Sequence, residues 1–510
     1  MLNTATSGII LAIAAYLLGM LYIGFKCASS STSAGGFYLG GRKLGPFVTA
    51  MSAEASDMSG WLLMGLPGVA LAGSIAEASW TAIGLAIGTY VNWLIVAKRI
   101  RIYSHKAGDS VTIPEFFANR FRDNSGLIKG IAAIVIVIFF IPYTASGFNA
   151  CGKLFESLFG ISYIGSMLVS AIIIVAYTTM GGFLAASTTD FVQSIIMTAA
   201  LIFVLIFGTV KAGGASAVIE NAQNLKGYFS LTSFVSDGSV QSYGTLTIAS
   251  TLAWGLGYFG MPHILLRFMA IEDKDKIKLS RRVASIWVVI AMFIAITIGI
   301  IGYSLVNANI VDVGGDAETI IVRLAHLIST HGFGYAIIAG LILAGILAST
   351  MSTADSQLLA AASSISEDIA KGVFKINISE KKTISVARFT VIGIAVIAAF
   401  MARQSNSVFR IVSFAWAGFG ASFGPVVLFA LFWKRTNKQG AVAGMLAGGI
   451  MVFVWKYIIA AKLGGIFAIY ELLPAFIFAC IAIVVVSLLT KAPEKEITDE
   501  FEEVCRICKN

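Results

Sequence analysis

The chain has 510 residues, of which 57% are hydrophobic and only 12% are charged, and its mean hydropathy is +0.86. Because soluble globular proteins carry about 25% charged residues, this composition excludes that class and predicts an all-α protein that crosses a lipid bilayer many times. The formal net charge of +9 does not indicate nucleic-acid binding, since the basic residues gather in short loops between apolar segments.

Apolar segments of about 20 residues recur along the whole chain, and each can cross a hydrocarbon core about 30 Å thick. The sequence predicts about thirteen transmembrane helices in a single membrane domain, residues 1–510, at approximately 7–26, 46–73, 77–97, 127–152, 160–180, 186–211, 243–269, 283–306, 333–366, 384–402, 408–433, 439–461 and 467–490. The first is not predicted to be a cleaved signal peptide, because Lys26 follows it and no basic residue precedes it.

Basic residues alternate between the predicted loops. They gather near 42–43, 98–122, 274–282, 371–382 and 434–438, whereas the loops between these carry few. Positively charged short loops face the cytoplasm. We therefore expect a multi-pass protein of the cytoplasmic (inner) cell membrane, with the N-terminus outside and residues 491–510 as a cytoplasmic tail.

The second predicted span carries two carboxylates, Glu54 and Asp57, among the small and polar residues that precede Trp61. A carboxylate at membrane depth costs about 2.5 to 3.5 kcal/mol even on the lenient insertion scale. A cation is the obvious partner. We interpret this stretch as an ion or substrate site, and we expect a helix break near residues 56–60.

The seventh predicted span contains a pattern of three glycines, Gly255, Gly257 and Gly260, that matches the dinucleotide fingerprint. The pattern lies inside a membrane-length apolar segment just before Pro262, so the strand and crossover helix that the fingerprint requires are not predicted here. Glycines and a proline within a span instead indicate a broken helix.

The two predicted breaks stand in corresponding places, because five spans separate the second span from the seventh. Paired interruptions of this kind point to the binding site of an inverted-repeat transporter. We predict repeats at 46–212 and 243–433, a peripheral first helix at 7–26, and two peripheral C-terminal helices within 439–490.

Cysteines and histidines indicate no enzyme chemistry. Cys505 and Cys508 form a single CxxC pair in the charged tail, which we interpret as incidental thiols in a solvated segment rather than as a zinc or redox site. The histidines show no metal-ligand spacing. We predict no enzyme activity, no cofactor and no obligatory protein partner.

Several strings resemble the sodium:solute symporter family, and its sodium/proline symporters most closely. They are LGGR at 39–42, LGPFVTA at 44–50, ASDMSGWLLMGLPG at 55–68, WGLGYFG at 254–260 with Pro262 and His263, MST at 351–353 with QLL at 357–359, and WAGFGA at 416–421 with FGPVV at 423–427. The resemblance runs from about residue 10 to residue 490. It implies the fold with five plus five inverted repeats of the leucine-transporter type, with broken helices.

The resemblance also implies a sodium site. Its ligands would be the backbone carbonyls of Ala55, Met58 and Ser349 and the hydroxyls of Ser352 and Thr353. Sodium prefers several oxygen ligands, which an unwound helix and a neighbouring Ser/Thr pair supply. Asp57 would couple the ion to the substrate, and Asp190 would lie toward the cytoplasmic exit, with a second cation site there left open.

The substrate pocket implied by the resemblance comprises residues at both breaks and in the fourth span: Asp57, Gly60, Trp61, Tyr143, Trp254, Tyr258 and Pro262. A zwitterionic amino acid needs hydrogen-bond donors for its carboxylate, an acceptor or aromatic face for its ammonium and an apolar wall. On α-helical geometry Trp254 and Tyr258 share one face. Ordinary packing of these aromatic residues remains the alternative.

Three positions depart from the proline pattern: Glu54 where a small residue is usual, Met261 where glutamine is usual, and Ser349 where alanine is common. For Asp355, an ion-pathway role and a structural role are left open. Four further charges are expected to be solvated or interfacial, namely Glu77, Glu156, Arg403 and Arg410.

Together these features predict sodium-coupled uptake of L-proline by alternating access, with sodium as the co-transported ion. The alternatives are a symporter of another small amino acid or organic solute, a sodium-permeable channel, a transporter-like sensor and an intramembrane enzyme. Saturable, stoichiometric uptake separates a symporter from the last three.

Overall fold

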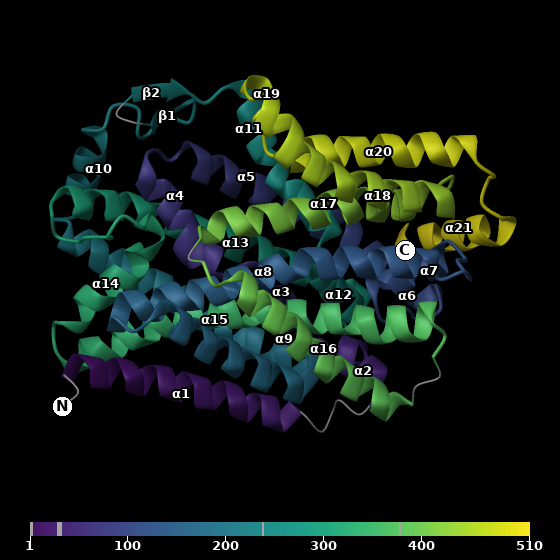
Figure 1. The fold of residues 1–510 in the computed structure, drawn as a ribbon, viewed down its shortest axis with the longest axis horizontal. Coiled ribbons are helices and arrows are strands. Elements are labelled where there is room, and N and C mark those ends of the chain that lie inside the picture. The colour runs from purple at the N-terminus through teal and green to yellow at the C-terminus, as the bar shows by residue number, and fades with distance from the viewer. Residues whose placement is uncertain (1–3, 28–32, 237–238, 377–378, 405, 510) are drawn as a thin grey trace.

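The computed structural model describes residues 4–27, 33–236, 239–376, 379–404 and 406–509. This part of the chain is a bundle of helices whose long axes run in broadly similar directions, with α1 (Thr4–Cys27) along one edge (Figure 1). Ten of the described helices are long and apolar enough to cross a membrane. Each predicted span falls on a helical segment.

The helices outside the two broken spans follow in chain order. The long ones are α5 (Ala76–Val91) continued by η4 (Asn92–Val96) and α6 (Ala97–Lys106), α8 (Leu127–Phe159), α9 (Tyr163–Lys211), α13 (Ile277–Asn307), α15 (Phe333–Ser363) continued by η8 (Ser364–Val373), α16 (Glu380–Met401), α17 (Val408–Phe432), α18 (Lys438–Val454) continued by η9 (Trp455–Ala460), and α20 (Leu472–Leu489). The short ones are α2 (Ala34–Leu39), η2 (Gly40–Arg42), α7 (Ile113–Arg120), α10 (Ala215–Gln223), η6 (Lys274–Lys276), η7 (Ala317–Thr319), α14 (Ile320–Ser329), α19 (Ala461–Leu463), η10 (Gly465–Phe467) and α21 (Lys495–Lys509).

The fifth and sixth predicted spans form one element, α9, with a kink. Gly182 in its middle has φ 61° and ψ −161°, a conformation that glycine adopts without steric penalty. The kink lies where the sequence indicated a connection between two apolar segments.

Both predicted breaks are present. In the second span, α3 (Pro46–Asp57) ends at Asp57, and the chain resumes as η3 (Trp61–Gly65) and α4 (Leu66–Ala72). In the seventh, α11 (Thr245–Leu252) passes into the 3₁₀ segment η5 (Ala253–Gly260), and α12 (Pro262–Ala270) follows. Each break places non-helical backbone within the bundle.

Glycines bring the second break against α5. A Cβ atom on Gly84 would lie 2.5 Å from the Leu252 carbonyl oxygen and 2.9 Å from the Leu252 Cα. A Cβ on Gly88 would overlap the backbone of Gly255. The backbones of α5 and η5 are therefore in direct contact, which holds the interrupted span in the core.

Two features of the described structure differ from the sequence predictions. A short antiparallel hairpin, β1 (Ser233–Ser236) and β2 (Ser239–Ser242), precedes α11. The tail interpreted as solvated forms α21, which buries Ile497, Phe501 and Val504. These apolar residues recur at helical spacing in a charged segment, so the helix packs on one face. Burial raises the pKa of the Cys508 thiol, which lowers its reactivity.

We expect Gly84→Ala to destabilise the protein, because the added methyl group meets backbone that cannot move aside. Overpacking of this kind costs about 1 to 3 kcal/mol. A lower melting temperature of the detergent-purified protein would confirm it. Gly24→Ala in α1 is the matched control, since its Cβ would meet nothing within 4 Å, and an equal loss in both variants would contradict the contact.

Candidate functional site

The end of α3 meets the middle of α15 through a buried polar junction. The Ser352 hydroxyl donates to the Ala55 carbonyl oxygen at 2.7 Å and lies 3.1 Å from the Ser349 carbonyl oxygen. The Thr353 hydroxyl donates to the same Ser349 carbonyl at 3.1 Å. The structure thus brings together four of the sodium ligands that the family resemblance implies, namely Ala55, Ser349, Ser352 and Thr353. Their oxygens are hard ligands suited to an alkali cation.

Met58, the remaining proposed ligand, lies at the break itself. Its φ and ψ are −76° and 70°, whereas an α-helical ψ is about −42°. Its N–H still donates to the Glu54 carbonyl at 2.8 Å. The helix therefore ends here, and the Met58 carbonyl leaves the direction of the α3 axis.

Asp57 connects the two breaks. Its Oδ2 accepts a hydrogen bond from the Tyr258 hydroxyl at 2.6 Å, and its backbone oxygen accepts one from the Trp61 indole at 3.1 Å. The Asp57 side chain is fully buried, and its Oδ1 has no hydrogen-bond partner among the described residues. A buried carboxylate oxygen without a donor is costly unless a ligand meets it.

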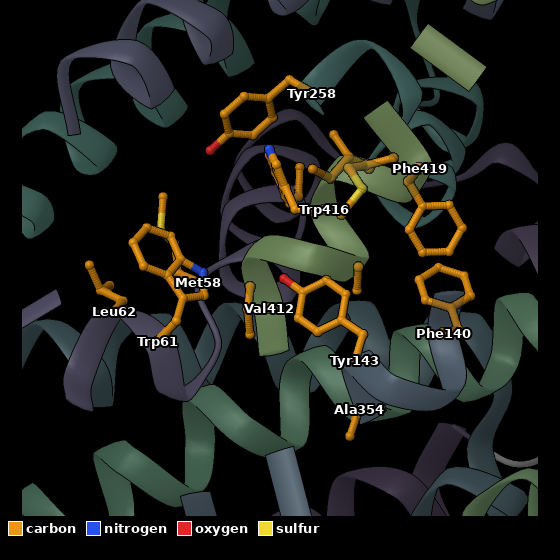
Figure 2. Packing of buried hydrophobic residues seen from close by; sticks show 14 of the residues in the cluster. Met58, Trp61, Leu62, Phe140, Tyr143, Tyr258, Ala354, Val412, Trp416 and Phe419 are labelled. Atoms are coloured by element: carbon orange, nitrogen blue, oxygen red, sulfur yellow. The ribbon is translucent and has the colours of Figure 1, made fainter. Parts of the chain in front are cut away.

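Aromatic side chains gather between the breaks. Figure 2 shows Trp61, Tyr143, Tyr258 and Trp416 in this region. Tyr258 packs edge-on against Trp416 with ring centroids 5.1 Å apart, and Trp61 lies 6.3 Å from Trp254. The Tyr143 hydroxyl lies 3.4 Å from the Asp57 carbonyl oxygen. Three of the predicted pocket residues thus surround Asp57.

Trp254 and Tyr258 do not share one helical face. The segment that carries them is a 3₁₀ helix, which has about three residues per turn, so positions four apart are rotated by about 120°. Trp254 stacks on Tyr470 at 5.2 Å, and its carbonyl accepts from the Trp416 indole at 2.8 Å. Trp254 therefore packs against Tyr470, whereas the Tyr258 hydroxyl bonds Asp57.

The other two predicted pocket residues, Gly60 and Pro262, lie at the two breaks. Pro262 is the buried first residue of α12, where its fixed φ suits a helix start. A Cβ on Gly60 would lie 2.8 Å from the Ala150 Cβ of α8, so Gly60 lets α8 approach the break.

A cavity of about 1050 Å³ opens beside this region, and residues of the β1–β2 hairpin are part of its lining. Figure 1 shows this hairpin at one end of the bundle. Trp254 and Phe409 are among its lining residues, together with the exposed charges Glu77 and Arg410. Trp61, Tyr143 and Tyr258 do not line it and are at most 1% exposed. These three side chains are therefore closed off from the cavity, hereafter the vestibule.

The sequence analysis missed Arg267 of α12. Its Nη2 lies 3.1 Å from Asp190 Oδ2 and 2.5 Å from the Ser356 hydroxyl, and the Ser52 hydroxyl donates to the same Asp190 oxygen at 2.7 Å. Arg267 thus supplies the positive charge beside Asp190. A lone arginine inside the apolar segment 243–269 was an available signal, because a charge at membrane depth requires a partner.

The remaining charged candidates separate by burial. Glu54 is buried and accepts from the Trp93 indole at 3.0 Å. Asp355 is buried and accepts from the Ser356 hydroxyl at 3.0 Å. The four charges expected to be solvated or interfacial, Glu77, Glu156, Arg403 and Arg410, are exposed.

Comparisons with known proteins identify relatives over nearly the whole chain. The model of the sodium:solute symporter family matches residues 37–448. A sodium/proline symporter of Haemophilus influenzae is 43% identical over 96% of this chain and 96% of its own length. The osmoregulated proline transporter OpuE of Bacillus subtilis is 41% identical, with 96% of both chains covered.

A solved structure also matches. It is a Na⁺-coupled sialic acid symporter in a substrate-bound outward-open state, with a TM-score of 0.77, 19% sequence identity, and coverage of 96% of this chain and 99% of that chain. This likeness shows the fold, an all-α polytopic membrane protein with a leucine-transporter-type core and broken helices. By its family model and its full-length relatives, the chain belongs to the sodium:solute symporter family.

Proposed function

We propose that this protein imports L-proline together with sodium across the cytoplasmic membrane. The observation that carries the proposal is the junction of Ala55 with Ser349 and Ser352 beside the Asp57–Tyr258 hydrogen bond. The names of the full-length relatives, which are sodium/proline symporters and proline transporters, support the choice of solute.

Sodium would bind at the junction of α3 and α15. Its ligands would be the carbonyls of Ala55, Met58 and Ser349 and the hydroxyls of Ser352 and Thr353. The two hydroxyls now donate to carbonyl oxygens, and on ion binding they would turn their lone pairs inward. An ion held by both helices would fix the break in one arrangement.

Proline would bind next to this ion. Its ammonium would lie beside the carboxylate of Asp57, which is buried between the two breaks. Its carboxylate would face Gly60 and Trp61, because the η3–α4 helix begins there and presents the positive end of its dipole. Its ring would pack on Trp61, Tyr143 and Tyr258, with Trp254 and Pro262 completing the pocket at the second break.

Transport would proceed by alternating access between two inverted repeats, 46–212 and 243–433, with 7–26 and 439–490 at the periphery. In Figure 1 α1 begins at one end of the bundle and α21 lies toward the other, which is the arrangement expected for an outside N-terminus and a cytoplasmic tail at 491–510. The vestibule would then be extracellular. Each sodium charge crossing about 100 mV adds about 2.3 kcal/mol, or roughly fiftyfold accumulation.

A symporter of another small solute is the second candidate. Met261 is fully buried at the end of η5, directly before Pro262, and it offers the pocket no hydrogen-bonding group beyond its backbone.

Asp190 would act with Arg267 as an ion pair near the cytoplasmic exit rather than as a second cation site.

We expect proteoliposomes that contain the protein to accumulate labelled L-proline when an inward sodium gradient is imposed. Potassium and proton gradients of the same size are the controls, and neither should drive accumulation. If sodium drives the uptake of another amino acid or organic acid from a panel but not of proline, the prediction of sodium coupling is confirmed and the prediction of proline as the solute is wrong. Fluxes that do not saturate would indicate a channel.

We expect Ser352→Ala to weaken sodium activation by about tenfold, or roughly 1.4 kcal/mol, because it removes a hydroxyl ligand from the junction. Proline affinity at saturating sodium should change little. The matched control is Ser363→Ala, which removes a buried hydroxyl from the same helix at a bond to its own backbone. An equal shift in both variants in sodium titrations of uptake would contradict the junction as a sodium site.

We expect Asp57→Asn to abolish the coupling of sodium to proline. The asparagine retains the shape of the side chain and an oxygen for the Tyr258 hydroxyl but loses the negative charge. Glu156→Gln neutralises an exposed carboxylate and serves as the control. Normal sodium activation in Asp57→Asn uptake assays would refute this role.

A further inference from the structure

Four buried side-chain oxygens next to the first break have no hydrogen-bond partner among the described residues. They are Glu54 Oε2 and Asp57 Oδ1 of α3, Thr89 Oγ1 of α5, and Asn92 Oδ1 of η4. Their side chains are at most 1% exposed. Since buried polar groups are nearly always satisfied in native proteins, a cluster without partners requires an explanation.

Hydrogen bonds draw these residues together around Tyr258. Glu54 Oε1 accepts from the indole of Trp93, the neighbour of Asn92, at 3.0 Å. The Asn92 amide nitrogen donates to the Tyr258 carbonyl at 3.0 Å, and the Tyr258 hydroxyl donates to Asp57 at 2.6 Å. Glu54, Asp57 and Asn92 are thus linked through Trp93 and Tyr258 in one region where α3, η4 and η5 meet.

Spacing along each helix agrees with this convergence. Glu54 and Asp57 are three residues apart on α3, and residues at this spacing lie on one face. Thr89 precedes Asn92 by three residues in the same way. The η4 segment that begins at Asn92 is π-helical, a distortion that is common at functional sites.

The charges of this region are unbalanced. The two carboxylates receive side-chain hydrogen bonds only from neutral donors among the described residues, namely the Trp93 indole and the Tyr258 hydroxyl. The nearby guanidinium of Arg267 is engaged by Asp190. Because Asn92 uses its amide N–H toward Tyr258, its oxygen is available as an acceptor. A proton would satisfy one of these oxygens, whereas a cation can be shared by all of them.

We propose that Glu54, Asp57, Thr89 and Asn92 form a second sodium site, separate from the junction of α3 with α15. Carboxylate, amide and hydroxyl oxygens are ligands that a hard cation prefers. The proposal rests on the sodium-coupled uptake proposed above. It sets the stoichiometry at two sodium ions per proline.

The charge balance of the loaded protein supports this number. Proline is a zwitterion without net charge, and the junction of α3 with α15 consists of neutral carbonyls and hydroxyls. Two sodium ions would therefore match the two carboxylates of this site, Glu54 and Asp57, while it is closed on both sides. Matching these two charges avoids the cost of leaving them unbalanced at membrane depth.

The test is equilibrium binding of ²²Na⁺ to the purified protein, combined with the limit of proline accumulation in proteoliposomes. With a tenfold sodium gradient and zero membrane potential, one ion per proline limits accumulation to about tenfold and two ions to about a hundredfold, because their free energies add. The wild-type protein should bind two ions and approach the higher limit. Glu54→Gln and Glu54→Ala should each bind one ion and reach the lower limit.

The control is Glu156→Gln at the end of α8, which should retain both ions. The proposal is overturned if the wild-type protein binds one sodium ion, or if Glu54→Gln retains two. Sodium-driven uptake at one ion per proline would overturn this site and leave the proposed symport intact. Two bound ions without proline uptake would support the site and contradict proline as the transported solute. Proton entry coupled to uptake, together with a single bound sodium ion, would mean that Glu54 binds a proton instead of sodium. This result would also overturn the site.

Discussion

The constraint on which the rest of the structure depends is the interruption of α3 at Asp57, inside a membrane span. Backbone groups freed within a bilayer must find partners in the protein, because lipid offers none. Here the Ser352 hydroxyl reaches the Ala55 carbonyl from α15, and the Trp61 indole reaches the Asp57 carbonyl from η3. The helix break is therefore held by side chains from other elements, and any motion of α15 relative to α3 changes its hydrogen bonds.

The second break is tied to the first by a few direct contacts. The Tyr258 hydroxyl bonds Asp57, and the backbone of η5 lies on the glycines of α5. The Trp416 indole from α17 holds the Trp254 carbonyl at the rim of the vestibule. In our account an ion at the first break and a solute between the two breaks act on the same set of contacts. If sodium binds more tightly to the arrangement that also binds proline, it shifts the protein toward that arrangement. The size of the shift is set by the difference between the affinities of sodium for the two arrangements.

The features predicted from the sequence are those that hydrophobicity and backbone chemistry determine locally. Long apolar segments fix the spans, and the glycines and Pro262 fix the break near η5. Pairing between distant residues could not be read in this way. Asp190 and Arg267 are 77 residues apart, and the sequence analysis named one without the other. The 3₁₀ geometry of η5 and the packing of α21 also depend on neighbours that periodicity alone does not identify. The ligand roles of the residues at the junction came from the family resemblance, and the repeat boundaries and site roles remain proposals.

The most direct test of the central claim is the equilibrium binding of labelled L-proline to the purified protein in sodium and in potassium at equal ionic strength. If sodium orders the break and thereby the pocket, proline should bind at least about tenfold more tightly in sodium, and proline should tighten sodium binding by the same factor. Equal proline affinities in the two salts, with clear binding in both, would contradict the account.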